Sequence, residues 1–154
     1  MNNRIDMKNK NVIDMEYEYQ YFTMSEVFTN CSDSEIALCC RTNCLDSLLV
    51  LLRFLDEFRD FIESPIVLNS TFRDFNHNKR VGGVVTSQHL LGQAIDFSTP
   101  KMPNDITILK LKEFIRMSPM SVSLSQVIFY NNFIHIGLRT QSHKILTYYD
   151  KRKH

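Results

Sequence analysis

In TSQHLLGQAIDFS, residues 86–98, an acid stands inside an apolar run. Asp96 lies between Ile95 and Phe97, in a short segment whose composition is typical of a buried β-strand. A lone charge in such a strand is costly unless the carboxylate is paired or binds a metal ion. The stretch therefore predicts a strand at 94–98 whose acid has a partner.

The segment FIHIGLR, residues 133–139, places one histidine in a second apolar strand. Because successive side chains of a strand point to opposite faces, we expect His135 on the face opposite Ile134 and Ile136. The same alternation puts Asp96 on the face opposite its apolar neighbours. Each of the two strands thus presents one side chain able to bind a metal on the face away from the core.

Three side chains form a candidate metal site: His89, Asp96 and His135. Two histidines and one carboxylate leave a fourth zinc position for a water molecule, which the metal makes acidic and nucleophilic. The alternative is structural: Asp96 pairs with an arginine or caps a turn, and His135 is an ordinary strand histidine. The placement of glycine, which suits sharp turns and close approach, supports the metal site. All four glycines flank the proposed ligands in sequence: Gly82, Gly83, Gly92 and Gly137.

Two amphipathic helices are expected elsewhere in the chain. Residues 46–62 carry apolar side chains at helical spacing with charged residues between them, and the segment before Pro65 should end that helix. A second helix is expected over 104–117 by the same criterion. The apolar stripe of the first helix consists of Leu48, Leu51, Leu52, Leu55, Phe58 and Ile62.

The remaining pattern predicts an α+β fold with a largely antiparallel sheet. Asn131 and Asn132 separate two apolar runs and indicate a hairpin, since asparagine tolerates the left-handed turn conformation. A polar connection is expected over 71–86, and Thr23 or Ser25 is expected to cap a helix in YFTMSEVF, residues 21–28. Strand patterns occur at 65–70, 94–98, 126–130, 133–139 and 144–149.

Composition is typical of a single globular domain. The chain has 154 residues, of which 44% are hydrophobic and 23% charged, enough for one buried core. We expect a polar leader at 1–20, one domain at 21–150 and a basic tail, KRKH, at 151–154. The net charge of +1 argues against nucleic acid as a partner. No apolar run is long enough to span a membrane.

Three further expectations concern the place of synthesis, the oligomeric state and the cysteines. The N-terminus shows no signal-peptide pattern, so we expect synthesis in the cytoplasm. We also expect the protein to act as a monomer. The four cysteines lack paired Cys-x-x-Cys spacing, which favours reduced, partly buried thiols over a zinc site. These cysteines are Cys31, Cys39, Cys40 and Cys44.

Several segments carry a resemblance to a known family. SQHLLGQAID, residues 87–96, resembles the Ser-x-His-x-x-Gly-x-Ala-x-Asp signature of zinc D-alanyl-D-alanine carboxypeptidases and phage endolysins, especially their small phage- and bacterium-encoded branch. NSTFRDFNHNKRVGG, residues 69–83, is similar to the SGYRSPxxNxxVGG-like segment that precedes this signature. QVIFYNNFIHI, residues 126–136, is similar to a later QLI…WVHV segment, and YFTMSEVF to an FTLxE opening. The resemblance covers residues 21–148.

The resemblance implies a hedgehog/D-Ala-D-Ala-peptidase-like fold and a role for each matched residue. His89, Asp96 and His135 would hold one Zn²⁺ per chain. Arg73, which matches the arginine of the SGYR segment, would hold a substrate carboxylate or stabilise the oxyanion, a task that suits a forked and permanently charged guanidinium. Ser87 would form a hydrogen bond near the site. The implied substrate is a peptidoglycan stem peptide.

The sequence departs from the family pattern where the general base belongs. Family members place a glutamate or aspartate shortly before the last zinc histidine, whereas FYNNFIH, residues 129–135, contains no carboxylate. Tyr130 or Asn132 occupies this place, depending on the position of a one-residue gap. Asparagine cannot take a proton from water, and a phenol is a poor base at neutral pH, although it can donate to an oxyanion. Asp74 is a third candidate, as a substitute base.

Two other histidines have simpler interpretations. His77 is expected in a loop near the site, where it could touch substrate, although a plain loop histidine is the simpler hypothesis. His143 is expected in a turn.

Three hypotheses for function follow. The first is a zinc-dependent carboxypeptidase or endopeptidase that cuts stem peptides, and the missing signal pattern favours a phage-encoded enzyme of lysis or cell-wall entry. The second is a catalytically impaired, zinc-containing domain that binds peptidoglycan or a partner, which the missing carboxylate supports. The third is a structural domain without metal.

Overall fold

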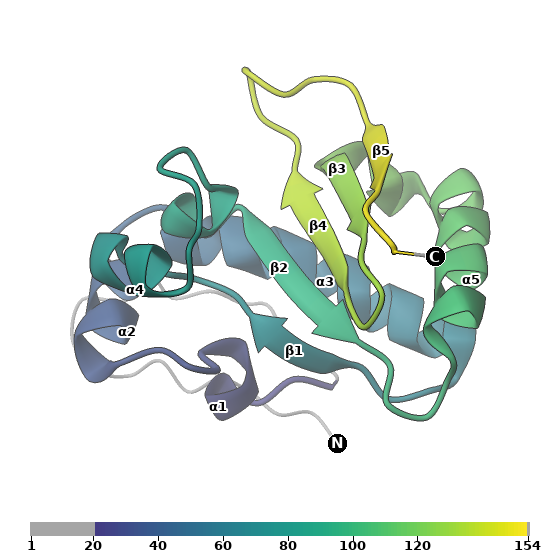
Figure 1. Cartoon of the computed structure of the whole chain (residues 1–154), viewed down its shortest axis with the longest axis horizontal. Helices are drawn as coiled ribbons and strands as arrows, with labels where there is room; N and C mark the ends of the chain where they lie inside the picture. Colours follow the sequence, from purple (N-terminus) through teal and green to yellow (C-terminus); the bar gives the residue numbers. More distant parts are fainter. Residues whose placement is uncertain (1–20, 154) are drawn as a thin grey trace.

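The computed structural model describes residues 21–153, so the expected leader and His154 lie outside the described residues. Its sheet has the strand order β1-β2-β4-β3-β5, and every pairing is antiparallel except that of β3 with β5 (Figure 1). The predicted α+β class with a largely antiparallel sheet is confirmed. The strands are β1 (Val67–Ser70), β2 (Ala94–Ser98), β3 (Leu124–Phe129), β4 (Ile134–Leu138) and β5 (Thr147–Asp150).

Two of the helices confirm the amphipathic patterns in the sequence, at α3 and α5. The helix α1 follows Thr23, whose hydroxyl accepts a hydrogen bond from the Glu26 amide, so Thr23 is the helix cap. The α-helices are α1 (Met24–Val27), α2 (Asp33–Arg41), α3 (Cys44–Ile62), α4 (Phe75–Arg80) and α5 (Asn104–Met117), and two short 3₁₀ helices are η1 (Gln88–Leu91) and η2 (Pro119–Ser123).

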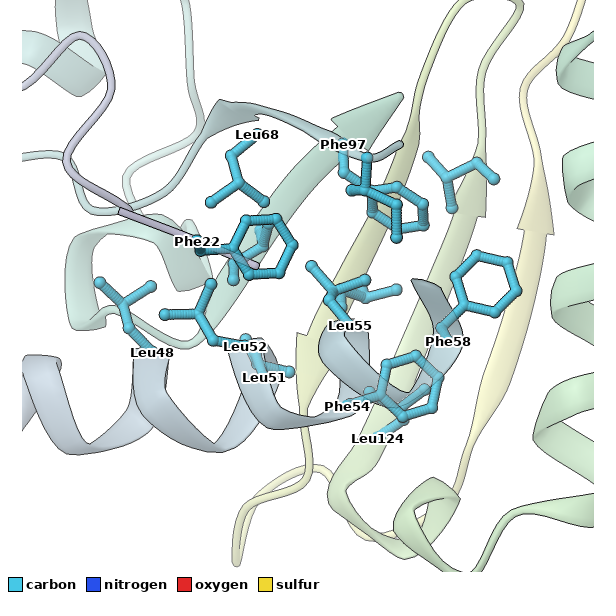
Figure 2. Packing of buried hydrophobic residues seen from close by; sticks show 14 of the residues in the cluster. Phe22, Leu48, Leu51, Leu52, Phe54, Leu55, Phe58, Leu68, Phe97 and Leu124 are labelled. Atoms are coloured by element: carbon cyan, nitrogen blue, oxygen red, sulfur yellow. The ribbon is translucent and has the colours of Figure 1, made fainter. Parts of the chain in front are cut away.

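The core lies between α3 and one face of the sheet. α3 runs behind the strands in Figure 1 and contacts β2, β4 and α5. All six residues of the predicted apolar stripe are buried, and Figure 2 shows α3 side chains among Leu68, Phe97 and Leu124 from the strands. Burying each large apolar side chain contributes roughly 1.5–3 kcal/mol. This packing covers one face of the sheet and leaves the face of Asp96 and His135 on the other side.

α3 ends before Pro65, as the sequence predicts. Proline disfavours helical geometry in the residue before it, and the helix stops at Ile62. Glu63 caps it with a left-handed φ of 50°, and its amide donates to the carbonyl of Arg59. The chain can then turn directly into β1.

Two helices were not expected from the sequence. The segment 71–86 was expected to be a polar connection, but it contains α4, whose first turn is capped by the Asp74 carboxylate at 2.7 Å from the His77 amide nitrogen. α2 begins at a capping box in which Ser32 and Glu35 bond to each other's backbone amides. Neither helix shows a long apolar stripe, so periodicity alone does not reveal them.

The hairpin between β3 and β4 forms as predicted, but for a different reason. The Tyr130 amide donates to the Phe133 carbonyl at 3.0 Å, which closes a turn over two asparagines. Among the described residues, positive φ outside glycine occurs only at Asn30 and Glu63, so neither turn asparagine is left-handed. The Asn104 side chain instead holds the turn by donating to the carbonyls of Tyr130 and Asn131, at 2.7 and 3.0 Å.

None of the described helices combines the length and the apolar composition that crossing a bilayer requires.

Candidate metal centre

The structure brings three predicted ligands together on the sheet face opposite α3. Asp96 on β2 and His135 on β4 are direct cross-strand partners, and His89 reaches them from η1. One potential ligand atom from each of the three lies within 4.8 Å of the other two. We refer to His89, Asp96 and His135 as the triad.

Both oxygens of the Asp96 carboxylate face a histidine nitrogen. Asp96 Oδ1 lies 2.7 Å from His135 Nδ1, and Asp96 Oδ2 lies 3.3 Å from His89 Nε2. Zinc–ligand bonds of about 2.0–2.2 Å place tetrahedral ligand atoms roughly 3.3–3.6 Å apart. The 3.3 Å between Asp96 and His89 agrees with this, whereas the 2.7 Å between Asp96 and His135 is a hydrogen-bond distance.

A hydrogen bond fixes the tautomer of His89. Its Nδ1 lies 2.6 Å from the Thr71 carbonyl, which can only accept, so Nδ1 carries the hydrogen and donates it. Nε2 then presents its lone pair to the triad. Donation from the second ring nitrogen to a carbonyl is the arrangement that orients metal-binding histidines.

Two buried nitrogens of the triad have no hydrogen-bond partner among the described residues. They are Nε2 of His89 and Nε2 of His135. Buried polar atoms are nearly always satisfied, so each orphan requires an explanation. For His89, a cation beside the lone pair would supply the missing partner, and together with the carboxylate this donor set fits a zinc ion.

Local backbone geometry holds His89 in place. The Ser87 hydroxyl caps η1 by accepting from the His89 amide at 3.3 Å. Gly92 ends this turn with a φ of +64°, and a Cβ there would lie 2.2 Å from the Cys44 carbonyl oxygen. Only glycine combines that conformation with that approach. The signature residues of the sequence thus form the turn that presents His89.

The Asp96 carboxylate is held in its ionised form. Burial alone would raise its pKa, but the hydrogen bond with His135 Nδ1 outweighs burial and holds the pKa well below its usual range. The triad therefore offers a negative charge at neutral pH.

A cleft of about 520 Å³ surrounds the triad. Its other lining residues come from the segment 73–88, from β3 and the following turn, and from the segments flanking β5. Among the described residues, Asp96 is the only carboxylate in the lining. Arg73, Ser87, Tyr130, His143 and Lys151 also line this cleft, which we call the triad cleft.

Arg73 enters the triad cleft beside Asp96. Its guanidinium lies 3.5 Å from Asp96 Oδ2, and it also donates to the Ser70 hydroxyl at 3.0 Å and to the Asn78 side-chain oxygen at 3.2 Å. Its side chain is only 13% exposed. The Asp96–arginine contact considered as a structural alternative is present, but it is the longest of these contacts and lies within the cleft.

The three candidates for a base or an oxyanion donor separate clearly in space. Tyr130 lines the triad cleft and stacks on Phe133 with ring centroids 4.3 Å apart. Asn132 is exposed in the hairpin turn and Asp74 caps α4; neither lines the cleft. Of the candidates, Tyr130 alone lines the triad cleft.

His77 differs from its expected role. It lies on α4 rather than in a loop, is buried, and its Nδ1 contacts Glu35 at 2.8 Å. It does not line the triad cleft, so it braces the fold rather than touching substrate. The four cysteines are free thiols, with Cys39 buried and the other three half-buried.

Sequence reasoning missed the parts of the cleft that come from distant or backbone groups. The carbonyl that orients His89 belongs to Thr71, and any residue type could supply it. His143 lies in its expected turn, closed by backbone bonds with Thr140, but it also lines the cleft. Lys151 belongs to the segment that the sequence predicts as a basic tail. No local pattern marks these residues, because the tertiary fold alone brings them to the triad.

Two histidines and a carboxylate in one cleft are the donor set of a mononuclear zinc site with an open position. A family model described as peptidase M15 matches residues 20–137, and the chain belongs to this peptidase family. Membership supports a zinc peptidase that acts on peptidoglycan in general. A comparison with curated proteins found no match.

Proposed function

We propose that the protein is a zinc metallopeptidase that hydrolyses a peptide bond in bacterial peptidoglycan stem peptides. The observation that carries this proposal is the triad, with an orphaned and correctly tautomerised His89 nitrogen beside an ionised Asp96. A zinc ion held there would polarise the scissile carbonyl and activate a water molecule. We propose one such ion per chain and a monomeric enzyme.

The side chains around the triad have distinct roles in this proposal. Arg73, held by Ser70 and Asn78, binds the substrate carboxylate or the developing oxyanion next to Asp96. Ser87 holds the turn that presents His89. The Tyr130 hydroxyl donates a hydrogen bond to the oxyanion, a task that a phenol performs without losing its proton.

The expected site of action is the cell wall. Within the cell wall, we propose that the protein acts as an enzyme of phage lysis or cell-wall entry. The cleavage can be of the carboxypeptidase or the endopeptidase type, and the bond is identified by the products in the experiment below.

A second candidate function is a zinc-containing domain that binds peptidoglycan or a partner without cutting it. One observation favours it: within residues 21–153, the triad cleft has no carboxylate other than Asp96. General bases for metal-bound water are most often carboxylates or histidines. His143 also lines the cleft, but it is not one of the three triad residues.

The two candidates are separated by one experiment. Protein loaded with zinc is incubated with synthetic stem pentapeptides and with intact peptidoglycan sacculi, and products are identified by mass spectrometry. Peptide cleavage that disappears in His89→Ala supports the peptidase. Stoichiometric zinc and binding to sacculi, with no product from any substrate, would reject the peptidase and support the binding domain.

A further inference from the structure

Lys151 lines the triad cleft, although it lies beyond the stretch that matches the peptidase family, residues 20–137. It follows β5 directly, and its amide donates to the Phe129 carbonyl at 2.8 Å, which continues the pairing of β5 with β3. Its ammonium lies 5.9 Å from the centroid of the Tyr130 ring. The lysine is therefore a neighbour of the one candidate base that faces the cleft.

Arg152 fixes the segment that carries this lysine. Its guanidinium donates to Asp105 at 2.9 Å and to Asp150 at 2.7 and 2.9 Å, and only 19% of its side chain is exposed. Asp105 lies in the first turn of α5, so this contact ties the segment to a helix. The basic segment is thus anchored to α5 rather than being a free tail.

A second clamp joins the same segment to the hairpin turn. The Lys153 amide donates to the Asn131 side-chain oxygen at 3.0 Å, and the Asn131 side-chain nitrogen donates to the Lys153 carbonyl at 3.1 Å. Asn131 is adjacent to Tyr130. The hairpin turn and the segment after β5 therefore form one unit, with the Lys151 ammonium over the Tyr130 ring.

The charges of the triad cleft are unbalanced. Its basic side chains other than histidine are Arg73 and Lys151, and its one carboxylate among the described residues, Asp96, is engaged by the triad histidines. Arg73 follows β1 and Lys151 follows β5, the two edge strands, while the triad carboxylate lies on β2 between them. Cations thus flank the metal centre from opposite edges of the sheet.

We propose that Lys151 binds a carboxylate of the peptide substrate on the β5 side of the triad, and so determines which peptides the protein accepts. The proposal rests on the proposed function in that the ligand is a peptide. An ammonium is a compact point charge with three donors, which suits a single carboxylate group. Stem peptides offer such groups in a glutamyl residue and at their terminus. Arg73 serves the region of the scissile bond, and Lys151 a second anionic group.

The test compares peptides that differ only in their carboxylates. Anisotropy of labelled stem pentapeptides is measured with zinc-loaded protein, using the free peptide, the two singly amidated peptides and the doubly amidated one. We expect one amidation to weaken binding to the natural protein by about tenfold. The Lys151→Met variant should bind the free peptide about tenfold more weakly than the natural protein does. It should bind the amidated peptide as tightly as the natural protein does. Lys151→Arg should keep part of the preference.

Lys153→Met is the matched control, because this neighbouring lysine is held through its backbone and does not line the triad cleft. It should bind every peptide like the natural protein. The proposal is overturned if Lys151→Met binds the free peptide as tightly as the natural protein, or if it loses the same factor against the doubly amidated peptide.

The same samples are assayed for cleavage, so that the two proposals fail separately. Binding that depends on a carboxylate and on Lys151, with no cleavage of any peptide, would reject the peptidase and keep the lysine's role. If the peptides are cleaved but Lys151→Met binds them as tightly as the natural protein does, only the proposed role of Lys151 is rejected. Because the Lys151 side chain is exposed, its replacement should leave the melting temperature unchanged.

Discussion

Asp96 and His135 face each other across neighbouring strands, with 2.7 Å between a carboxylate oxygen and Nδ1. The pairing follows from strand register, because residues directly opposite in an antiparallel ladder share one face of the sheet. The register of β2 and β4 is set by the apolar residues on the opposite face, which pack on α3. The core thus determines which two side chains meet in the triad.

The first prediction concerns metal content. His89→Ala and Asp96→Asn should each reduce bound zinc from about one ion per chain to a small fraction, since each removes a ligand of a three-residue site. The measurement is elemental analysis of protein purified without chelators or nickel resin. His143→Ala is the control, because this histidine lines the same cleft outside the triad, and it should retain zinc.

Metal binding should also be visible in stability. A ligand at about a thousandfold excess over its Kd stabilises the folded state by about 4 kcal/mol, so chelation should lower the Tm of the natural protein by roughly 10 °C. His89→Ala should show no such shift. A natural protein whose Tm is indifferent to chelation would contradict the metal site altogether.

The second prediction concerns Gly92. Gly92→Ala places a Cβ 2.2 Å from the Cys44 carbonyl at a φ of +64°, and strain and overlap together should cost about 2–4 kcal/mol of unfolding free energy. Gly82→Ala is the matched control, since its φ is +74° but nothing lies within 4 Å of the added Cβ. It should cost only about 1 kcal/mol. Urea denaturation measures both, and equal losses would show that the contact with Cys44 is unimportant.

Part of this fold could be predicted from the sequence because it produces a local periodicity of apolar residues. The stripe of α3 and the alternation around Asp96 and His135 are repeats that a few residues reveal. α2 also carried a local signal, the capping box of Ser32 and Glu35, but its apolar face is short. Local patterns therefore identify the elements that supply the core and two of the ligands.

The rest depends on contacts between distant segments. α4 has no apolar stripe and is held by its cap and by the contact of His77 with Glu35 on α2. The orientation of His89 depends on the backbone of Thr71, which leaves no trace in residue type. Lys151 reaches the cleft only because β5 pairs in parallel with β3, a pairing that a basic terminus does not suggest. Such contacts require the assembled sheet.

The third prediction concerns acid stability and Glu35. Its buried carboxylate accepts from the amides of Asp74 and Ser32, at 3.0 and 3.1 Å, and contacts His77. Burial would raise the pKa of Glu35, but these contacts outweigh burial and lower it. A lowered folded-state pKa gives stability that is complete above the unfolded-state pKa of about 4.3 and is lost as the pH falls through the folded-state value.

Glu35→Gln should therefore be less stable than the natural protein at neutral pH, by about 1–3 kcal/mol. The two stabilities should converge as the pH falls from about 5 to about 3. Urea denaturation in the presence of chelator at several pH values measures the difference, and Asp96 contributes equally to both proteins. Glu57→Gln, at an exposed position of α3, should follow the natural protein throughout. A constant gap between Glu35→Gln and the natural protein across this range would contradict the linkage.

The fourth prediction concerns the position at which an added carboxylate can act as the general base. Tyr130 lines the triad cleft and Asn132 does not, although the sequence allows either to occupy the family's acidic position. If the natural protein lacks an effective base, Tyr130→Glu should create or raise stem-peptide cleavage, by about 10²–10⁴-fold for a well-placed base. Asn132→Asp, which adds the same kind of group outside the cleft, should not. Cleavage rates of zinc-loaded variants decide the matter, because activity gained in Asn132→Asp alone would place the reacting water at the hairpin turn and not beside Tyr130.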